Sequence, residues 1–135
     1  MIVADVNLLV YLLVRGEFTP LAERALRRDR RWVAPRSHRA ELLNVLATNV
    51  RAGVVRADTF DSLWRRAYRT VATPTDPDPS EVLRLSVDSR IATYDCEYVA
   101  MARRRRRLRL VTNDGPVQRA FPDVAIRLED FADRR

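Results

Sequence analysis

Four acidic residues stand inside or beside apolar segments of this 135-residue chain, at Asp5, Glu41, Asp95 and Asp114. Carboxylates that gather in a partly desolvated pocket repel one another and raise one another's pKa unless a cation neutralises them. Mg2+ and Mn2+ are hard cations that prefer carboxylate and water oxygens as ligands. We therefore interpret the four acids as a candidate site for one or two Mg2+ or Mn2+ ions.

Each acid also has an ordinary structural explanation, and the sequence leaves these alternatives open. Asp5 could cap a helix, although Asn7 competes for that role. Glu41 and Asp95 could simply complement the dipole at the start of a helix. Asp114 lies in an Asn-Asp-Gly-Pro segment that is typical of a turn or cap. Only the four acids taken together favour a metal site.

The elements that position these acids are short apolar strands alternating with helical patterns, an order that predicts an α/β fold with a parallel sheet flanked by helices on both faces. The length fits one domain over residues 1–135. The predicted strands are residues 1–4, 32–34, 71–73, 108–112 and 124–128. The predicted helices are residues 7–15, 20–30, 38–51, 79–90, 93–107 and 116–121, with another starting at Asp58 and with Thr19, Ser37 and Asp78 as caps.

In this arrangement the acids fall at informative places. Asp5 and Asp114 come just after the carboxyl ends of predicted strands, where open parallel sheets bind ligands. Glu41 and Asp95 lie in the first turns of predicted helices. The pattern permits all four side chains to converge, but periodicity alone does not establish that they do.

The charge balance points to a polyanionic partner. All 25 basic residues are arginine, and the formal net charge is +7. If four acids hold a metal, the remaining surface is more basic still. Arginine pairs bidentately with phosphate and stacks on bases, so RNA or DNA is the expected partner. A compositional bias against lysine would explain the missing lysine but not the excess of positive charge.

The densest basic segment is a run of five arginines at the end of a predicted helix. These side chains could form only a solvated helix terminus that complements the dipole, and an added role in RNA contact stays open. The residues of the run are Arg103, Arg104, Arg105, Arg106 and Arg107.

Several classes of protein are disfavoured. No apolar stretch is long enough to span a membrane, and Asp5 interrupts the apolar N-terminal run, which we interpret as core rather than as a signal sequence. The single cysteine, Cys96, cannot form an internal disulfide, so a cytoplasmic location is expected. His38 is the only histidine, and we do not expect it to act as a general base. We expect the aromatic residues Tyr94, Tyr98, Trp32 and Trp64 to serve packing.

Four segments, taken in order, carry a resemblance to a known family. They are Asp5-Val6-Asn7 after the first strand, Glu41 with Asn44 one turn on, Thr93-Tyr94-Asp95 before an apolar stretch, and Leu110-Val111-Thr112-Asn113-Asp114. The chain resembles the PIN-domain ribonucleases, and most closely the VapC type, the toxin half of VapBC toxin-antitoxin pairs. The resemblance covers essentially the whole chain.

The resemblance implies a single PIN-like domain with a sheet in the order 3-2-1-4-5, which makes strands 1 and 4 neighbours. It also implies that Asp5, Glu41, Asp95 and Asp114 form the catalytic acidic quartet, with Asp5 and Asp95 as the best direct metal ligands. The supporting polar residues would be Asn7, Asn44 and Thr112.

The function implied is a Mg2+- or Mn2+-dependent endoribonuclease that hydrolyses RNA phosphodiester bonds as the toxin of a type II toxin-antitoxin system. The implied partners are an RNA substrate, a VapB-like antitoxin and a second copy of the chain, with a higher toxin-antitoxin assembly also possible. Two other classes stay open. An RNA-binding translational repressor would explain the basic surface but not the acids, and a phosphatase of the haloacid-dehalogenase type would need an aspartate where Asn7 stands.

Overall fold

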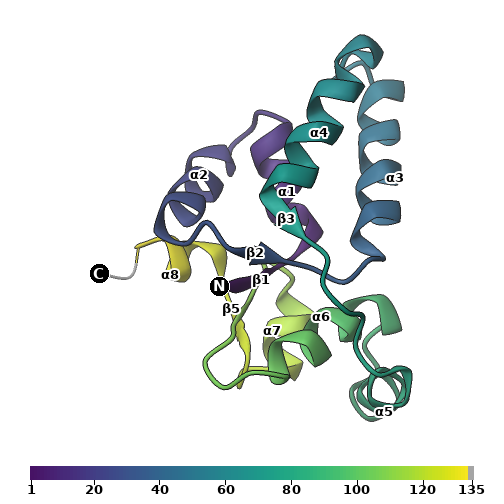
Figure 1. Ribbon diagram of the computed structural model, residues 1–135, viewed down its shortest axis with the longest axis vertical. Coiled ribbons are helices and arrows are strands. Elements are labelled where there is room, and N and C mark those ends of the chain that lie inside the picture. Colours follow the sequence, from purple (N-terminus) through teal and green to yellow (C-terminus); the bar gives the residue numbers. More distant parts are fainter. Residues whose placement is uncertain (134–135) are drawn as a thin grey trace.

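A five-stranded parallel sheet forms the centre of the computed structural model, which describes residues 1–133. The strand order is β3-β2-β1-β4-β5 (Figure 1), which confirms the predicted fold class and order. Ala4 of β1 pairs with Val111 of β4, so these strands end side by side. The strands are β1 (Ile2–Ala4), β2 (Trp32–Val33), β3 (Val71–Ala72), β4 (Leu110–Val111) and β5 (Ala125–Ile126).

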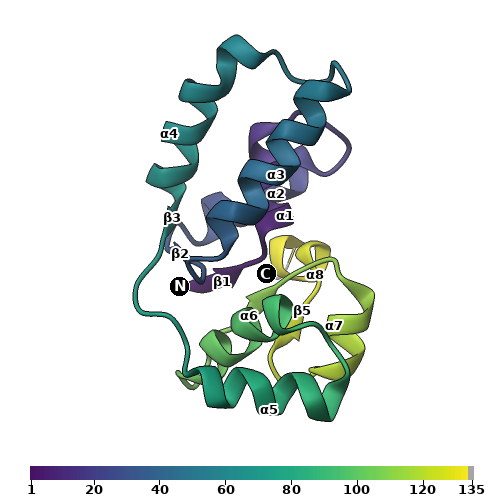
Figure 2. The same ribbon diagram turned by 90° about the vertical axis from the view of Figure 1, so that its right-hand side faces the viewer.

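Helices cover both faces of the sheet (Figures 1 and 2). One face carries α1 (Val6–Leu13), α2 (Thr19–Arg28), α3 (His38–Arg51) and α4 (Phe60–Thr70), and α8 (Leu128–Asp133) packs against α2. The other face carries α5 (Pro79–Ser89), α6 (Thr93–Arg103) and α7 (Gly115–Ala120). A 3-10 turn, Ala57–Thr59, joins α3 to α4, and these two helices form a hairpin that extends away from the sheet (Figure 2).

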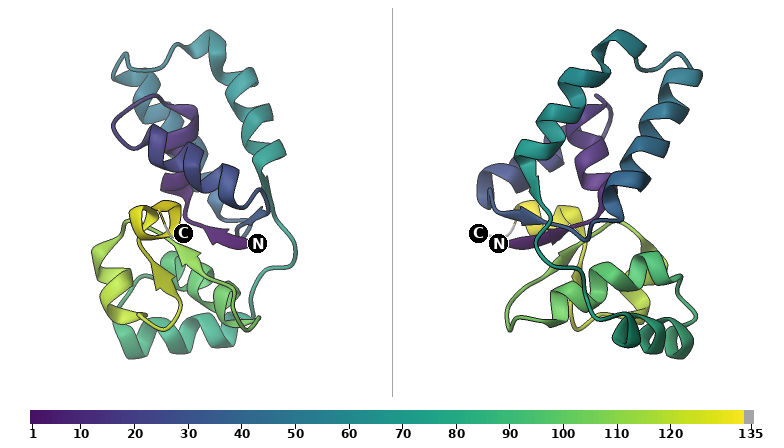
Figure 3. Two further views of the ribbon diagram at one scale, coloured as in Figure 1. Left: turned by 90° about the vertical axis from the view of Figure 1, so that its left-hand side faces the viewer. Right: turned by 45° about the vertical axis from the view of Figure 1, so that its right-hand side comes forward.

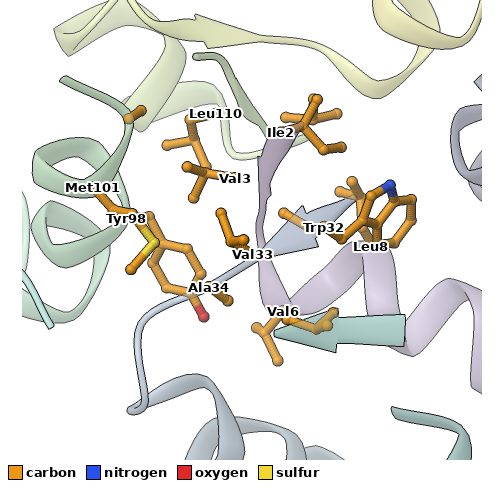
Figure 4. Packing of buried hydrophobic residues seen from close by; sticks show 14 of the residues in the cluster. Ile2, Val3, Val6, Leu8, Trp32, Val33, Ala34, Tyr98, Met101 and Leu110 are labelled. Carbon is orange, nitrogen blue, oxygen red and sulfur yellow. The ribbon is translucent and has the colours of Figure 1, made fainter. Parts of the chain in front are cut away.

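The core lies on both faces of β1, whose three residues are all buried. Figure 4 shows Val3 beside Leu110, with Tyr98 and Met101 of α6 close by, and Trp32 beside Leu8 of α1. Strands buried on both faces must be apolar throughout, which explains why the predicted strands appear as short unbroken apolar runs rather than alternating patterns. This packing fixes the ends of β1 and β4, the two strands that lead into Asp5 and Asp114.

Helix starts follow the capping rules in part. The Asp78 side chain accepts a hydrogen bond from the Ser80 N–H and Pro79 is the first residue of α5, as predicted. Thr19 and Ser37 were also predicted as caps. The Thr19 prediction is wrong, because Phe18 is the N-cap residue of α2, whereas Ser37 is the N-cap residue of α3 as predicted but makes no capping hydrogen bond with its side chain. The Thr19 hydroxyl donates to the Tyr11 carbonyl at 2.6 Å and accepts from the Gly16 N–H at 3.0 Å. The Ser37 hydroxyl also makes a tertiary contact, since it donates a hydrogen bond to Glu97 of α6.

Two further predictions need correction. The helix predicted for residues 93–107 ends at Arg103, and the following residues turn back toward β4. Arg107 has a φ of 79°, a left-handed conformation that a helix cannot contain. The sequence also predicted a strand through Leu128, where α8 begins instead. Leu128 is fully buried, and its N–H donates to the Asn113 side chain at 3.2 Å.

The contacts of Thr19 predict a measurable role in stability. The Thr19→Val variant should lower the free energy of unfolding by about 1–3 kcal/mol, because it removes the partner of the Gly16 N–H and of the Tyr11 carbonyl at a buried side chain. Urea denaturation measures this change. The matched control is Thr48→Val, whose exposed hydroxyl bonds only its own helix, and an equal loss in both variants would show that the Thr19 contacts contribute nothing special.

Candidate active site

Asp5 and Asp114 project from the C-terminal end of the sheet, by which we mean the end where the parallel strands finish. Asp5 follows β1 directly, and Asp114 follows β4 three residues on. Both also cap helices: Asp5 accepts from the Asn7 N–H at 3.3 Å, and Asp114 from the Val117 N–H at 2.9 Å. The capping explanation is therefore correct for both residues. A carboxylate has lone pairs enough to cap a helix and to accept further partners.

Thr112 joins these two acids through one hydroxyl. It is 1% exposed, and its Oγ1 donates to Asp5 Oδ2 at 2.5 Å while accepting from the Asp114 N–H at 3.0 Å. Its carbonyl accepts from the Gln118 side chain at 2.8 Å, which fixes the loop after β4. A buried hydroxyl with both functions used holds its neighbours in one geometry, so Thr112 sets the position of Asp5 relative to Asp114.

Glu41 and Asp95 reach the same region from helices on opposite faces of the sheet. Each lies in the first turn of its helix, Glu41 in α3 and Asp95 in α6, as predicted. Tyr98, one turn after Asp95, donates its hydroxyl to Glu41 Oε1 at 3.1 Å. Asp5, Asp95, Tyr98 and Thr112 are among the residues lining a hollow of about 10 Å³, which is room for roughly one water-sized particle.

The electrostatics of this region show that the acids sense one another. Burial raises the pKa of Asp5, and the charge of Asp114 adds to the rise. Burial also raises the pKa of Asp95, helped by Asp114 and Asp5. The pKa of Glu41 rises to about 7 through burial and through the charges of Asp5, Asp95 and Glu97, although the Tyr98 hydrogen bond opposes the rise. These carboxylates carry an unfavourable charge that a cation would neutralise.

The atom types of these residues fit a divalent cation, but their spacing in this structure is too wide to hold one. Their donors are oxygen atoms alone, which suits Mg2+ or Mn2+. Within residues 1–133, however, no three side chains of the types that ligate metals stand close enough together to hold one ion. The carboxylates are thus near enough to raise one another's pKa, and a cation would have to draw them closer.

The other candidate residues are placed less centrally. The Asn7 backbone N–H donates a hydrogen bond to the Asp5 carboxylate, but Asn7 itself is exposed. Asn44 is exposed on α3, with no side-chain hydrogen bond to the acids among the described residues. The His38 ring nitrogen Nδ1 contacts the Pro35 carbonyl at 2.9 Å, and burial lowers its pKa, consistent with a structural histidine. The expectation that Tyr94 serves packing is wrong, since it is 65% exposed.

Sequence reasoning missed two contributors to this site. Tyr98 was expected only to pack, and it is indeed buried, but its hydroxyl also holds Glu41. Glu97 was not considered, although it accepts from Ser37 and its charge acts on Glu41. One signal was available for Tyr98, because residues three apart share a helix face and Asp95 lies three residues before it.

A comparison with protein-family models matches residues 2–121 to the PIN domain. This chain belongs to the PIN-domain family. PIN domains are generally nucleases, and they typically use divalent metal ions. The family and the convergence of Asp5, Glu41, Asp95 and Asp114 therefore point to the same kind of chemistry.

One solved structure is similar over most of its length: the crystal structure of PAE2754 from Pyrobaculum aerophilum. The two share 20% sequence identity with a TM-score of 0.74, over 96% of this chain and 85% of that one. At this identity the likeness supports the fold alone. No curated protein matches the PIN-domain chain. Within residues 1–133 no helix is both long and apolar enough to cross a bilayer.

The raised pKa of Glu41 predicts how stability depends on pH. Between the ordinary pKa of 4.5 and about 7, the folded PIN domain keeps a proton on Glu41 that the unfolded chain has lost. The free energy of unfolding should therefore fall as pH rises through this window. After allowance for solvent screening, the Glu41 part should be on the order of 1–2 kcal/mol.

The measurement is urea denaturation in a chelating buffer at pH values spanning that window. The Glu41→Gln variant should lose this part of the pH dependence. The exposed Glu17→Gln variant is the control and should follow the wild type. If Glu41→Gln showed the wild-type slope, Glu41 would not titrate as described.

Proposed function

We propose that this PIN-domain protein is a Mg2+- or Mn2+-dependent endoribonuclease of the VapC toxin type. The observation that carries the proposal is the gathering of Asp5, Glu41 and Asp95, all with raised pKa values, at the C-terminal end of β1 and β4. Ligands bind at this end of open parallel sheets. A cluster of mutually repelling carboxylates is unfavourable unless it serves a cation, and PIN domains typically use one.

Asp5 and Asp95 would be the principal ligands, with Glu41 and Asp114 as further oxygen donors. Asp5 and Asp95 line one hollow, and each raises the pKa of a neighbouring carboxylate. A divalent cation bound there would supply a water of lowered pKa and neutralise charge that develops on the scissile phosphate. One or two ions fit this proposal.

The surrounding residues would hold these carboxylates in position. Thr112 fixes Asp5 through Oδ2, and Tyr98 fixes Glu41 through Oε1. Partners of this kind orient ligands and set their basicity, and their loss commonly costs about 10–100-fold in metal affinity or activity. Because Tyr98 and Thr112 are buried, they also keep bulk water out of the base of the site.

RNA is the proposed substrate because the chain has a net charge of +7 with arginine as its only basic residue. Arginine favours phosphate through paired hydrogen bonds. The toxin role, a VapB-like antitoxin partner, a homodimer within a toxin-antitoxin assembly and a cytoplasmic location complete the proposal. They rest on the ordered resemblance to VapC proteins.

A second candidate function is an RNA-binding repressor that does not cleave. One observation favours it, namely that no three metal-ligating side chains within residues 1–133 stand close enough to hold an ion. The raised pKa values weigh against it, because a protein that only binds RNA gains nothing from carboxylates placed where they repel one another and the substrate.

Conservative substitution of the principal ligands tests the proposal. Asp5→Asn and Asp95→Asn should each reduce cleavage of single-stranded RNA in Mg2+ by more than about 100-fold, the upper end of the loss expected when a residue that only orients a metal ligand is removed. Both variants should fold, because asparagine keeps the shape of aspartate and can still cap a helix. Electrophoresis of a labelled RNA measures cleavage, and circular dichroism verifies folding.

Asp88→Asn is the matched control, since Asp88 is exposed on α5 and makes no ion pair within the described residues. This variant should cut at the wild-type rate, and excess EDTA should stop both. RNA cleavage that survives in folded Asp5→Asn, or cleavage that continues in EDTA, would contradict the proposal.

A further inference from the structure

The arginine run Arg103–Arg107 lies far from the acidic residues, at the opposite end of the sheet. Helix α6 begins two residues before Asp95 and ends at Arg103, so it runs from the C-terminal end of the sheet back to the N-terminal end, where the strands start (Figure 3). Eight residues at 1.5 Å each separate Asp95 from Arg103 by about 12 Å along the axis. The run therefore does not line the candidate active site.

The run divides into engaged and unengaged arginines. Arg103 donates two hydrogen bonds of 3.1 Å to Asp123, and Arg104 donates to the carbonyls of Thr75 and Asp76. These two lie at the helix end and complement its dipole. The remaining three arginines are exposed, lie beyond the helix, and make no side-chain hydrogen bond or ion pair within residues 1–133: Arg105, Arg106 and Arg107.

The charge at a solvated helix end explains Arg103 and Arg104, but it does not explain these three unpaired arginines. Like charges in successive residues repel, and Arg107 also adopts a left-handed backbone conformation, with φ at 79°, that asparagine or glycine would adopt more easily. Three positive charges are therefore concentrated on one turn, and no acidic side chain within residues 1–133 forms an ion pair with them. A polyanion would relieve that repulsion.

An apolar hollow of about 400 Å³ adjoins this turn. Arg104 and Arg105 form part of its wall, and Met1, Pro74, Met101 and Leu108 form much of the rest. A second, open hollow of about 410 Å³ shares Arg105 and Leu108 and contains Arg106 and Arg107. The two hollows thus place apolar surface directly beside unpaired guanidinium groups. Met1 and Leu108 precede β1 and β4, which confirms that this surface lies at the N-terminal end of the sheet.

We propose that Arg105, Arg106 and Arg107, with the adjoining apolar hollow, form a second RNA-binding surface that holds a single-stranded segment outside the candidate active site. The guanidinium groups would bind successive phosphates, and an unstacked base would occupy the hollow. This inference rests on the proposed function for its substrate. RNA is favoured over an acidic peptide because the candidate active site at the other end of the same helix would hold the same polyanion.

The distance between the candidate active site and the arginine surface sets a minimum length for an RNA that contacts both. At about 3.4 Å per nucleotide of a stacked strand, the 12 Å along α6 corresponds to about four nucleotides. Because Arg105, Arg106 and Arg107 lie beyond Arg103, an RNA of four nucleotides or fewer could occupy one surface but not both. Longer RNA should bind more tightly because the second contact becomes intramolecular.

The test compares two variants of equal charge. In the first, Arg105→Gln, Arg106→Gln and Arg107→Asn are combined, with asparagine chosen for its tolerance of the left-handed conformation. The control combines Arg27→Gln, Arg66→Gln and Arg69→Gln, three exposed arginines beside a hollow between α2 and α4. Fluorescence polarisation in EDTA measures the Kd for a long single-stranded RNA and for a tetranucleotide at several salt concentrations.

We expect the first variant to bind the long RNA about tenfold or more weakly, with the slope of log K against log salt reduced by about 2, because three phosphate contacts on a single strand are lost. Tetranucleotide binding, which is weaker at the outset because it offers the run fewer phosphates, should weaken by a smaller factor, and the control should resemble the wild type. An Arg106→Glu single variant should weaken long-RNA binding in the same direction if the triple variant fails to fold. Abasic sites in the long RNA, placed outside a four-nucleotide stretch, should weaken its binding to the wild type, because no base then occupies the hollow.

Equal losses in the two triple variants would overturn the proposal, since they would reflect net charge alone. An unchanged salt slope would also overturn it, as would a run that binds polyglutamate but not RNA. Because binding is measured in EDTA, these results are independent of cleavage. Absence of nuclease activity with intact run-dependent binding would contradict the proposed function but support this surface.

Discussion

The structure depends on one electrostatic constraint: carboxylates from separate elements are held together where β1 and β4 end. The Thr112 hydroxyl holds Asp5 and the Asp114 backbone, and the Tyr98 hydroxyl holds Glu41. Burial and neighbouring charges raise the pKa of Asp5 and of Glu41, and the hydrogen bonds from Thr112 and Tyr98 oppose that rise. The fold gains stability from its apolar strands and loses some of it at this site. Such a local cost is typical of functional sites, where stability is given up for chemistry.

The packing around β1 explains why the strands can be so short. Four of them have only two residues, yet their positions are fixed because β1 is buried on both faces and its neighbours pair with it in parallel register. The helices that follow the strands carry the functional side chains, and both Asp5 and Asp114 serve as their caps. The proposed cation site would use the same carboxylates that cap these helices, so it would need no acids beyond those at the two helix starts and in the first turns of α3 and α6.

Much of the fold could be predicted from sequence, because unbroken apolar strands, Asp78-Pro79 and the glycine or proline stops carry local signals. The strand order came from the family resemblance, since local patterns do not say which strand lies beside which. The end of α6 could not be predicted, because arginine is a good helix former and nothing in the run announces the left-handed turn at Arg107. Tyr98 showed the same limit at the site: its burial was foreseen, but its bond to Glu41 joins helices 57 residues apart in sequence.

Charge is distributed along α6 with opposite signs at its two ends, acids near its start and unpaired arginines beyond its end. A net charge of +7 therefore combines two separate regions of opposite charge. The acidic region suits a cation, and the basic region suits a phosphate backbone. The arginines would attract an RNA held by both regions. Because these arginines lie away from the carboxylates, they would not form ion pairs with them and displace a metal ion.

The most direct test of the central claim is anomalous diffraction from crystals grown with Mn2+. The account predicts a strong anomalous peak within ligand distance of Asp5 and Asp95, with Glu41 or Asp114 drawn toward it, and no peak there in crystals of Asp5→Asn. A well-ordered structure with no peak between these carboxylates at saturating Mn2+, or with Mn2+ bound only elsewhere, would contradict it.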